Sequence, residues 1–144
     1  MNDVAAVLNA KGSEVATISQ DATLREAAAE LAHRRIGALV VVAESGGVVG
    51  IVSERDLVGC LAVHGAESVE RPVEAAMTSE VVTATLQTPV LAALAIMTNR
   101  RVRHLPVISG ESLVGIVSIG DLVKHRMDQI EAEAEALRAY IQSS

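Results

Sequence analysis

One strand-to-helix unit occurs twice in this chain of 144 residues. The first copy reads VVGIVSERDLV from Val48, and the second reads LVGIVSIGDLV from Leu113. Each copy places four apolar residues around one glycine, then a serine, and then an aspartate three residues later that begins a second apolar run. This order predicts a buried strand that leads into a helix. A chain that repeats such a unit is expected to fold as two similar halves.

The segments that precede the two units also repeat in the same order. In the first half, a short strand at residues 15–18 is followed by an amphipathic helix at about 24–35 and by the β-branched strand 36–42. In the second half, residues 81–83 match the short strand, and residues 105–108 match the β-branched strand. The register is ungapped until the hairpin turn, where one residue is lost, so the period is roughly 65 residues.

Each half therefore predicts the order helix, strand, helix, strand, strand, helix. A half of about 60 residues buries too little apolar surface to be stable alone, so the two halves are expected to pack together. The predicted fold class is α/β (α+β), with two pseudo-twofold-related β-α-β-β-α repeats and a C-terminal helical extension. We expect the first repeat, with an N-terminal helix, at residues 1–65, the second at 66–125 and the extension at 126–144.

The extension has a heptad pattern. No Gly or Pro interrupts residues 124–142. Apolar residues at steps of 4, 3, 4, 3 and 4 form an a/d seam of Val123, Met127, Ile130, Ala134, Leu137 and Ile141. Such a seam pairs with a second copy of the chain or lies over the protein's own core, and the sequence leaves both arrangements open.

Composition argues against several classes of function. The net charge is −6 and Tyr140 is the only aromatic residue, whereas single-stranded nucleic-acid binders offer basic grooves and aromatic stacking platforms. No run approaches the ~20 apolar residues of a membrane span, and Met1-Asn2-Asp3 lacks a secretion signal. We therefore expect a cytoplasmic protein that contacts no membrane and for which nucleic acid is an unlikely partner.

Metal and catalytic chemistry also lack their usual patterns. Cys60 is the only cysteine, which excludes disulfide frameworks, and the four histidines show no paired ligand spacing. The sequence has no nucleophile elbow, no dinucleotide fingerprint and no phosphate-loop motif. We expect neither a metal site nor enzymatic activity.

The two junctions of strand and helix are the candidate sites. Ser53 with Asp56, and Ser118 with Asp121, have the spacing of helix-capping residues, which is one interpretation. The other is ligand binding, because a carboxylate at a helix start is held ionised by the local dipole and its two oxygens match a cis-diol. Free amides at the same terminus suit phosphate. The residues alone leave both interpretations open.

The doubled Gly-Ile-Val-Ser-x-x-Asp-Leu pattern, preceded in the second copy by Arg-Arg-Val-Arg-His-Leu-Pro-Val, resembles a tandem pair of CBS domains. These are cystathionine-β-synthase domains, and the pair is sometimes called a Bateman module. The resemblance extends from about Val15 to Lys124, and is notably to small stand-alone bacterial CBS-pair proteins. It implies adenosine-containing ligands such as AMP, ADP, ATP or NAD(H), bound in clefts between the repeats. It also implies homodimers that associate through helices, and a separate, unidentified effector protein.

The resemblance assigns roles by position. Asp56 and Asp121 would accept hydrogen bonds from the ribose hydroxyls, while Ser53 and Ser118 would contact ribose or phosphate. Family clefts are shared crosswise, so the Asp121 cleft would include Ala16, Gly37 and Ala38. The Asp56 cleft would include Val82, Arg103 and His104. Because only the second set brings positive charge, the Asp56 cleft is expected to prefer the more phosphorylated ligand.

The leading hypothesis is a non-catalytic sensor of adenine nucleotides that uses no catalytic cofactor. Two departures from the family pattern bear on the sites: serine replaces the frequent threonine at both junctions, and Gly37 and Ala38 supply no side-chain donor. The alternatives are a structural dimerisation module with decayed sites, or a CBS pair that binds S-adenosylmethionine or nucleic acid. The acidic charge argues against nucleic acid.

Overall fold

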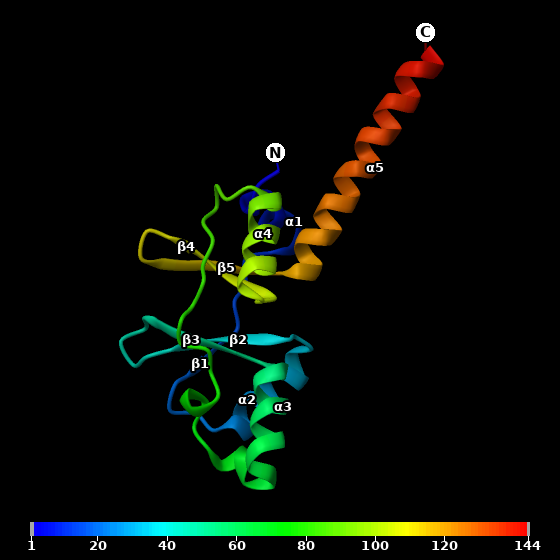
Figure 1. Ribbon diagram of the computed structural model, residues 1–144. Coiled ribbons are helices and arrows are strands. Elements are labelled where there is room, and N and C mark those ends of the chain that lie inside the picture. Colours follow the sequence, from blue (N-terminus) through cyan, green and yellow to red (C-terminus); the bar gives the residue numbers. More distant parts are fainter. Residues whose placement is uncertain (1, 144) are drawn as a thin grey trace. The chain divides into compact units, whose positions relative to one another are not determined.

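The structure, a computed structural model, describes residues 2–143 of the chain. It contains two compact units that do not follow the order of the chain. The N-repeat unit comprises Glu14–Val82, and the C-repeat unit combines Met1–Ser13 with Thr83–Ser144. Within each unit, helices lie against a small β-sheet (Figure 1). The predicted pair of β-α-β-β-α repeats with a long C-terminal helix is confirmed.

The N-repeat unit is built on a three-stranded sheet in the order β1-β2-β3. Strand β1 (Thr17–Ser19) is parallel to β2 (Ala38–Val42), because helix α2 (Leu24–Arg34) forms the crossover between them. Strand β2 then pairs antiparallel with β3 (Val48–Ser53). Helix α3 (Glu54–His64) follows directly, and two 3-10 helices, η1 (Gly65–Glu70) and η2 (Val73–Ala75), complete the unit.

One apolar face of α2 supplies much of the core of this unit. Leu24, Ala27 and Leu31 are buried on that face. They form one cluster with sheet residues and with η2, namely Leu39, Val41, Val52 and Val73. Each fully buried Leu or Val side chain stabilises the fold by about 1.5–3 kcal/mol. The core therefore holds β3, and with it the start of α3, in a fixed place.

The C-repeat unit has a two-stranded sheet, in which β4 (His104–Ser109) is antiparallel to β5 (Ser112–Ser118). Helix α4 (Val90–Arg100) precedes this hairpin and helix α5 (Ile119–Ser143) follows it. The buried side chains of these elements are Val90, Ala93, Met97, Leu105, Pro106, Val107, Val117 and Leu122.

The second repeat has no regular strand at residues 81–83, where the sequence predicts its first strand. Only an isolated parallel bridge forms there, between Ala84 and Val107. In the N-repeat unit, the matching ladder includes a hydrogen bond of 3.1 Å from the Val40 amide to the Ala16 carbonyl. The residue that corresponds to Val40 is Pro106, which has no amide hydrogen. The ladder is therefore reduced to the two hydrogen bonds of Ala84, with the Pro106 carbonyl at 3.0 Å and the Ile108 amide at 2.9 Å.

Helix α1 (Val4–Lys11) belongs to the C-repeat unit although it comes first in the chain. The Val4 amide donates to the Thr88 carbonyl at 2.9 Å. Leu8 packs against Gly115 so closely that a Cβ at Gly115 would lie 2.6 Å from Leu8 Cδ1. The boundaries expected at 65 and 125 thus describe the order of repeats in the sequence, whereas the second compact unit takes its first helix from residues 4–11.

Helix α5 is one continuous helix that includes the predicted extension. Its first turns pack in the C-repeat unit through Leu122, and its later turns extend away from that unit (Figure 1). Among residues 2–143, no helix combines the length and the apolarity that crossing a bilayer requires.

Candidate functional site

Both candidate junctions are reciprocal capping boxes. In the N-repeat unit, Ser53 is the N-cap of α3, and its Oγ accepts a hydrogen bond of 3.3 Å from the Asp56 amide. In return, Asp56 Oδ2 accepts from the Ser53 amide at 2.9 Å and from the Ser53 hydroxyl at 3.1 Å. Ser53 and Asp56 therefore cap α3, as their spacing predicts. Because the box uses only Oδ2, Oδ1 of Asp56 lies outside it.

The C-repeat junction repeats this geometry and adds a cation. The Asp121 amide donates to Ser118 Oγ at 3.1 Å, and Asp121 Oδ2 accepts from the Ser118 amide at 2.8 Å. The Lys11 ammonium donates to the same Oδ2 at 2.6 Å. This salt bridge is partly exposed, with 32% of the Lys11 side chain and 25% of the Asp121 side chain accessible to solvent.

The salt bridge changes the acidity of Asp121. Burial acts to raise the pKa of this carboxyl group, but hydrogen bonds from Lys11 and Ser118, together with the positive charge of Lys11, outweigh burial. The pKa of Asp121 therefore lies below its ordinary value, and the group is ionised at neutral pH.

Lys11 has no counterpart in the N-repeat unit, because another segment covers the corresponding strand edge there. The Ile51 carbonyl in β3 accepts from the Thr78 amide at 2.9 Å, in an antiparallel bridge. The corresponding carbonyl in β5, that of Ile116, accepts instead from Lys11 Nζ at 2.9 Å. Lys11 is the site residue that the sequence analysis missed. It lies 110 positions before Asp121, and only the packing of α1 against β5 brings the two together.

The backbone of each repeat lies close to its own junction. In the N-repeat unit, Ala38 is paired with Ser53, and the Gly37 carbonyl accepts from the Glu54 amide at 3.1 Å. In the C-repeat unit, His104 is paired with Ser118, and the Arg103 carbonyl accepts from the Ile119 amide at 2.9 Å. Fewer first-turn amides are therefore open to phosphate than the sequence analysis expects, since two in each helix already have acceptors.

Within each unit, most of the predicted residues lie beside the junction of their own repeat. Ala16 lies beside β2, where its carbonyl accepts from the Val40 amide, in the same unit as Ser53 and Asp56. Val82 is half-buried at the end of the N-repeat unit. The crosswise sharing of Ala16, Gly37, Ala38, Val82, Arg103 and His104 between repeats stays a prediction. Within the C-repeat unit, the Lys11 ammonium contacts the Asp121 carboxylate.

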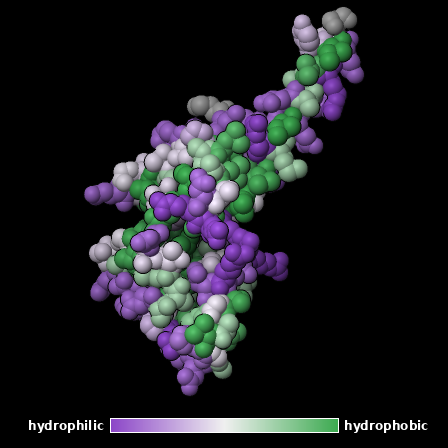
Figure 2. Space-filling model, viewed as in Figure 1, coloured by the Kyte–Doolittle hydropathy of each residue, from purple (hydrophilic) through white to green (hydrophobic). Residues whose placement is uncertain are grey.

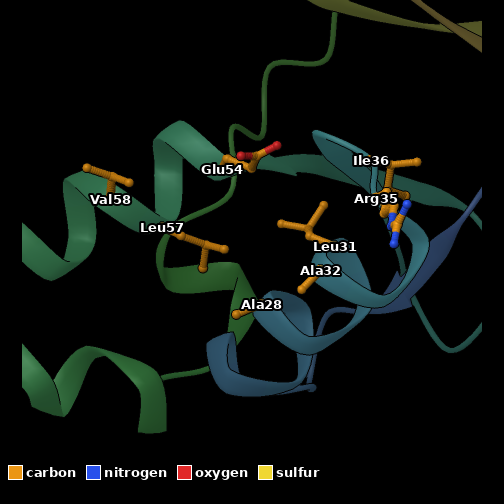
Figure 3. A pocket seen from close by; sticks show the side chains of 8 residues that line it. All are labelled: Ala28, Leu31, Ala32, Arg35, Ile36, Glu54, Leu57 and Val58. Atoms are coloured by element: carbon orange, nitrogen blue, oxygen red, sulfur yellow. The ribbon is translucent and has the colours of Figure 1, made fainter.

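An apolar groove of about 510 Å³ lies in the N-repeat unit between α2 and α3. Figure 3 shows Leu31 and Leu57 in this groove, with the charged side chains of Arg35 and Glu54 at its border. Neither Ser53 nor Asp56 is among its lining residues, so the groove is distinct from the capping box. In the described part of the chain, no three His, Cys, Asp or Glu side chains are grouped to hold a metal ion.

The family model of the CBS domain matches residues 10–63 and 73–128. Because these two segments cover most of the chain, the protein belongs to the CBS domain family. The mitochondrial CBS domain-containing protein CBSX3 of Arabidopsis thaliana is 39% identical over 126 residues. That match spans 85% of this chain and 61% of the plant protein.

Solved structures of CBS-domain proteins share the fold. The CBS-domain containing protein ATU1752 of Agrobacterium tumefaciens is 43% identical and has a TM-score of 0.84, with 86% of this chain and 92% of that chain covered. The CBS domain protein PAE2072 of Pyrobaculum aerophilum, complexed with AMP, is 29% identical and has a TM-score of 0.78, with 92% and 98% covered. The CBS domain pair of protein MJ0100, in complex with 5′-methylthioadenosine and S-adenosyl-L-methionine, is 26% identical and also has a TM-score of 0.78, with 88% and 97% covered.

Proposed function

We propose that this CBS pair is a non-catalytic regulatory module that binds AMP, ADP, ATP or NAD(H) at its two Ser-x-x-Asp junctions. The observation that carries the proposal is the doubled capping box, which fixes one aspartate oxygen on the protein and leaves Oδ1 outside the box. An ionised carboxylate held in this way is a strong acceptor for a ribose hydroxyl. Support also comes from PAE2072, a structural relative that binds AMP.

Such a module acts on a partner through its ligand. A nucleotide regulates an effector protein only if it binds two states of the module with different affinity. We infer that the effector is a separate protein and that the module acts in the cytoplasm. S-adenosylmethionine is the second candidate ligand, because the CBS pair of MJ0100 binds it.

We also propose that the protein is a homodimer that associates through helices. No residue of α3 is buried, and three of its apolar side chains are largely exposed: Val58 by 65%, Leu61 by 50% and Val63 by 76%. Exposed apolar faces of this kind are typical of surfaces that associate with another protein.

The test is calorimetric titration of nucleotide-free protein with AMP, ATP, NAD and S-adenosylmethionine. We expect saturable binding of at least one adenine nucleotide, and loss of that binding in the double variant Asp56→Asn/Asp121→Asn. The matched control is Asp128→Asn, which removes an exposed carboxylate away from both junctions and should leave affinity unchanged. Absence of heat with all four ligands would instead support a structural dimerisation module with decayed sites.

A further inference from the structure

Helix α5 has two distinct faces. One face, with Leu122 buried and His125 and Gln129 half-buried, packs in the C-repeat unit. Arg126, also half-buried, lies between this face and the seam and donates to Gln129 Oε1 at 3.1 Å. The adjacent face is the a/d seam, and most of its side chains are largely exposed, for example Met127 by 62% and Leu137 by 60%. Figure 2 shows hydrophobic residues along the part of the helix that extends away from the C-repeat unit. The seam therefore does not lie over the core of its own unit.

We propose that a second copy of the chain covers this seam, in a parallel and in-register two-stranded coiled coil. The steps of 4, 3, 4, 3 and 4 place Val123, Ile130 and Leu137 at d positions and the other three seam residues at a positions. A seam that contacts its own copy in register is self-complementary, as a twofold interface requires. The proposal rests on the homodimer proposed above and adds the orientation and the register of the helices.

The charges that flank the seam favour the parallel orientation. In a parallel pair, a g residue faces the e residue five positions later in the second helix. Arg126 and Glu133 occupy g positions, and Glu131 and Arg138 occupy e positions. Parallel pairing therefore brings Arg126 opposite Glu131, and Glu133 opposite Arg138, so both types of contact join opposite charges.

Antiparallel pairing of the same seam is disfavoured. With the two seams fully overlapped, e residues face e residues and g residues face g residues. Glu131 and Glu133 would then each face their own copies, and Lys124 would face Arg138. Like charges in such positions destabilise a helix pair. The seam spans fewer than three heptads, so we expect it to form because the rest of the dimer raises the local concentration of the two helices.

Disulfide cross-linking of the full chain tests the orientation. In a Cys60→Ala background, Leu137→Cys places thiols at facing d positions, within the 4.4–6.8 Å between Cα atoms that a disulfide spans. In a fully overlapped antiparallel pair, the two thiols would be ~15 Å apart along the helix axis. The matched control is Ala139→Cys, at an f position on the far side of the helix.

We expect Leu137→Cys to form a covalent dimer in a glutathione redox buffer at least tenfold faster than Ala139→Cys. Equal rates would overturn the coiled coil. Preferential formation of a mixed disulfide between Leu137→Cys and Met127→Cys chains would overturn the parallel orientation.

Charge reversal tests the register. By the proposal, Glu133→Lys and Arg138→Glu should each weaken dimerisation about fivefold in sedimentation at low salt, and the double variant should restore it. Arg138 also pairs with Glu135 in its own helix, at 2.7 Å. Glu135→Lys is therefore the control, and an equal effect of Glu135→Lys would overturn the intermolecular assignment.

These outcomes are separable from the proposed function. A wild-type dimer without cross-linking at residue 137 would exclude the coiled coil and leave the homodimer intact. A wild-type monomer at all concentrations would exclude both. Neither measurement depends on nucleotide, whose binding is titrated separately.

Discussion

The junction at Asp56 and the junction at Asp121 use the same capping box, but among residues 2–143 a cationic side chain is bonded only to the second carboxylate. Oδ2 of Asp56 accepts both of its hydrogen bonds from Ser53, the amide at 2.9 Å and the hydroxyl at 3.1 Å. Oδ2 of Asp121 accepts the Ser118 amide and the Lys11 ammonium. The C-repeat junction therefore adds a charged donor, the lysine, to the hydrogen bonds that its own serine supplies.

The origin of the difference is the segment that covers each strand edge. In the N-repeat unit, the backbone of Thr78 pairs with Ile51 of β3. In the C-repeat unit, the end of α1 lies at the same edge of β5 and brings Lys11 to Ile116 and Asp121. The repeated Ser-x-x-Asp motif forms the same cap in both repeats. The charge beside each cap depends on the segment at the strand edge, which contributes a backbone contact at Thr78 in one unit and the Lys11 side chain in the other. If both junctions bind nucleotide as proposed, this difference in charge predicts a difference in affinity between them.

The largest expected effect is the unequal loss of nucleotide affinity on removal of each carboxylate. A charge-assisted hydrogen bond is worth about 1.5–3 kcal/mol, so we expect Asp56→Asn to weaken AMP binding at its junction by about tenfold or more. Asp121→Asn should cost less, because Lys11 already neutralises much of the charge of Asp121. Two-site calorimetry of both variants measures the difference.

An effect of Asp121→Asn as large as that of Asp56→Asn would break this comparison. It would mean that the charge of Lys11 does not weaken Asp121 as a hydrogen-bond acceptor for the ligand. Thr23→Ala is the control for folding, since it removes the cap hydroxyl of α2 in the same unit and leaves Ser53 and Asp56 unchanged.

Much of the fold was predictable because apolar residues recur with the spacing of strands and helices, in the same order in both repeats. The apolar run at residues 48–52 and its copy at 113–117 form β3 and β5, and both serines begin helices. In the second repeat, Pro106 stands where the first repeat has Val40, and the first strand is reduced to a bridge at Ala84. This difference is visible only when the two repeats are aligned in register. Helix periodicity alone does not reveal that α1 packs with the second repeat.

The site was predictable only in part. The spacing of Ser53 and Asp56 is local, so a capping box follows from the sequence. Lys11 and Asp121 meet because Leu8 packs against Gly115, which is a tertiary contact that no local pattern contains. The exposed seam of α5 was visible as a heptad pattern, but its exposure required the structure.

A smaller effect is expected from Lys11→Met on acid stability. Because the pKa of Asp121 is depressed in the folded state, its ionisation stabilises the protein above the unfolded pKa of about 3.9, and this stabilisation is lost as pH falls through the folded value. Lys11→Met should move the folded pKa back towards its ordinary value. We expect a loss of about 0.5–1 kcal/mol of unfolding free energy at pH 7.

The measurement is urea unfolding of both proteins between pH 7 and pH 2. The difference between wild type and Lys11→Met should shrink as pH falls below 4 and vanish at the acid end. Lys124→Met is the matched control, because the Lys124 ammonium pairs with Asp128 on the exposed surface, where 79% of the Lys124 side chain is accessible. A difference that persists unchanged at pH 2 would show that Lys11 stabilises the unit by packing of its methylenes and not by charge.

The smallest expected effect concerns the two sheets, which differ by the hydrogen bond that Pro106 cannot donate. Pro106→Val restores an amide at the position where Val40 pairs with Ala16 in the other repeat. One new ladder hydrogen bond contributes roughly 0.5–1.5 kcal/mol, but replacing proline makes the unfolded chain more flexible and offsets about 0.4–1 kcal/mol of that gain. The free energy of unfolding should therefore change by only a few tenths of a kcal/mol.

Amide hydrogen exchange is the sensitive measurement. The new amide of residue 106 should exchange as slowly as that of Val107, which lies in the same buried strand. Fast exchange at residue 106 would mean that the segment before Ala84 is held away from β4 by something other than the missing donor.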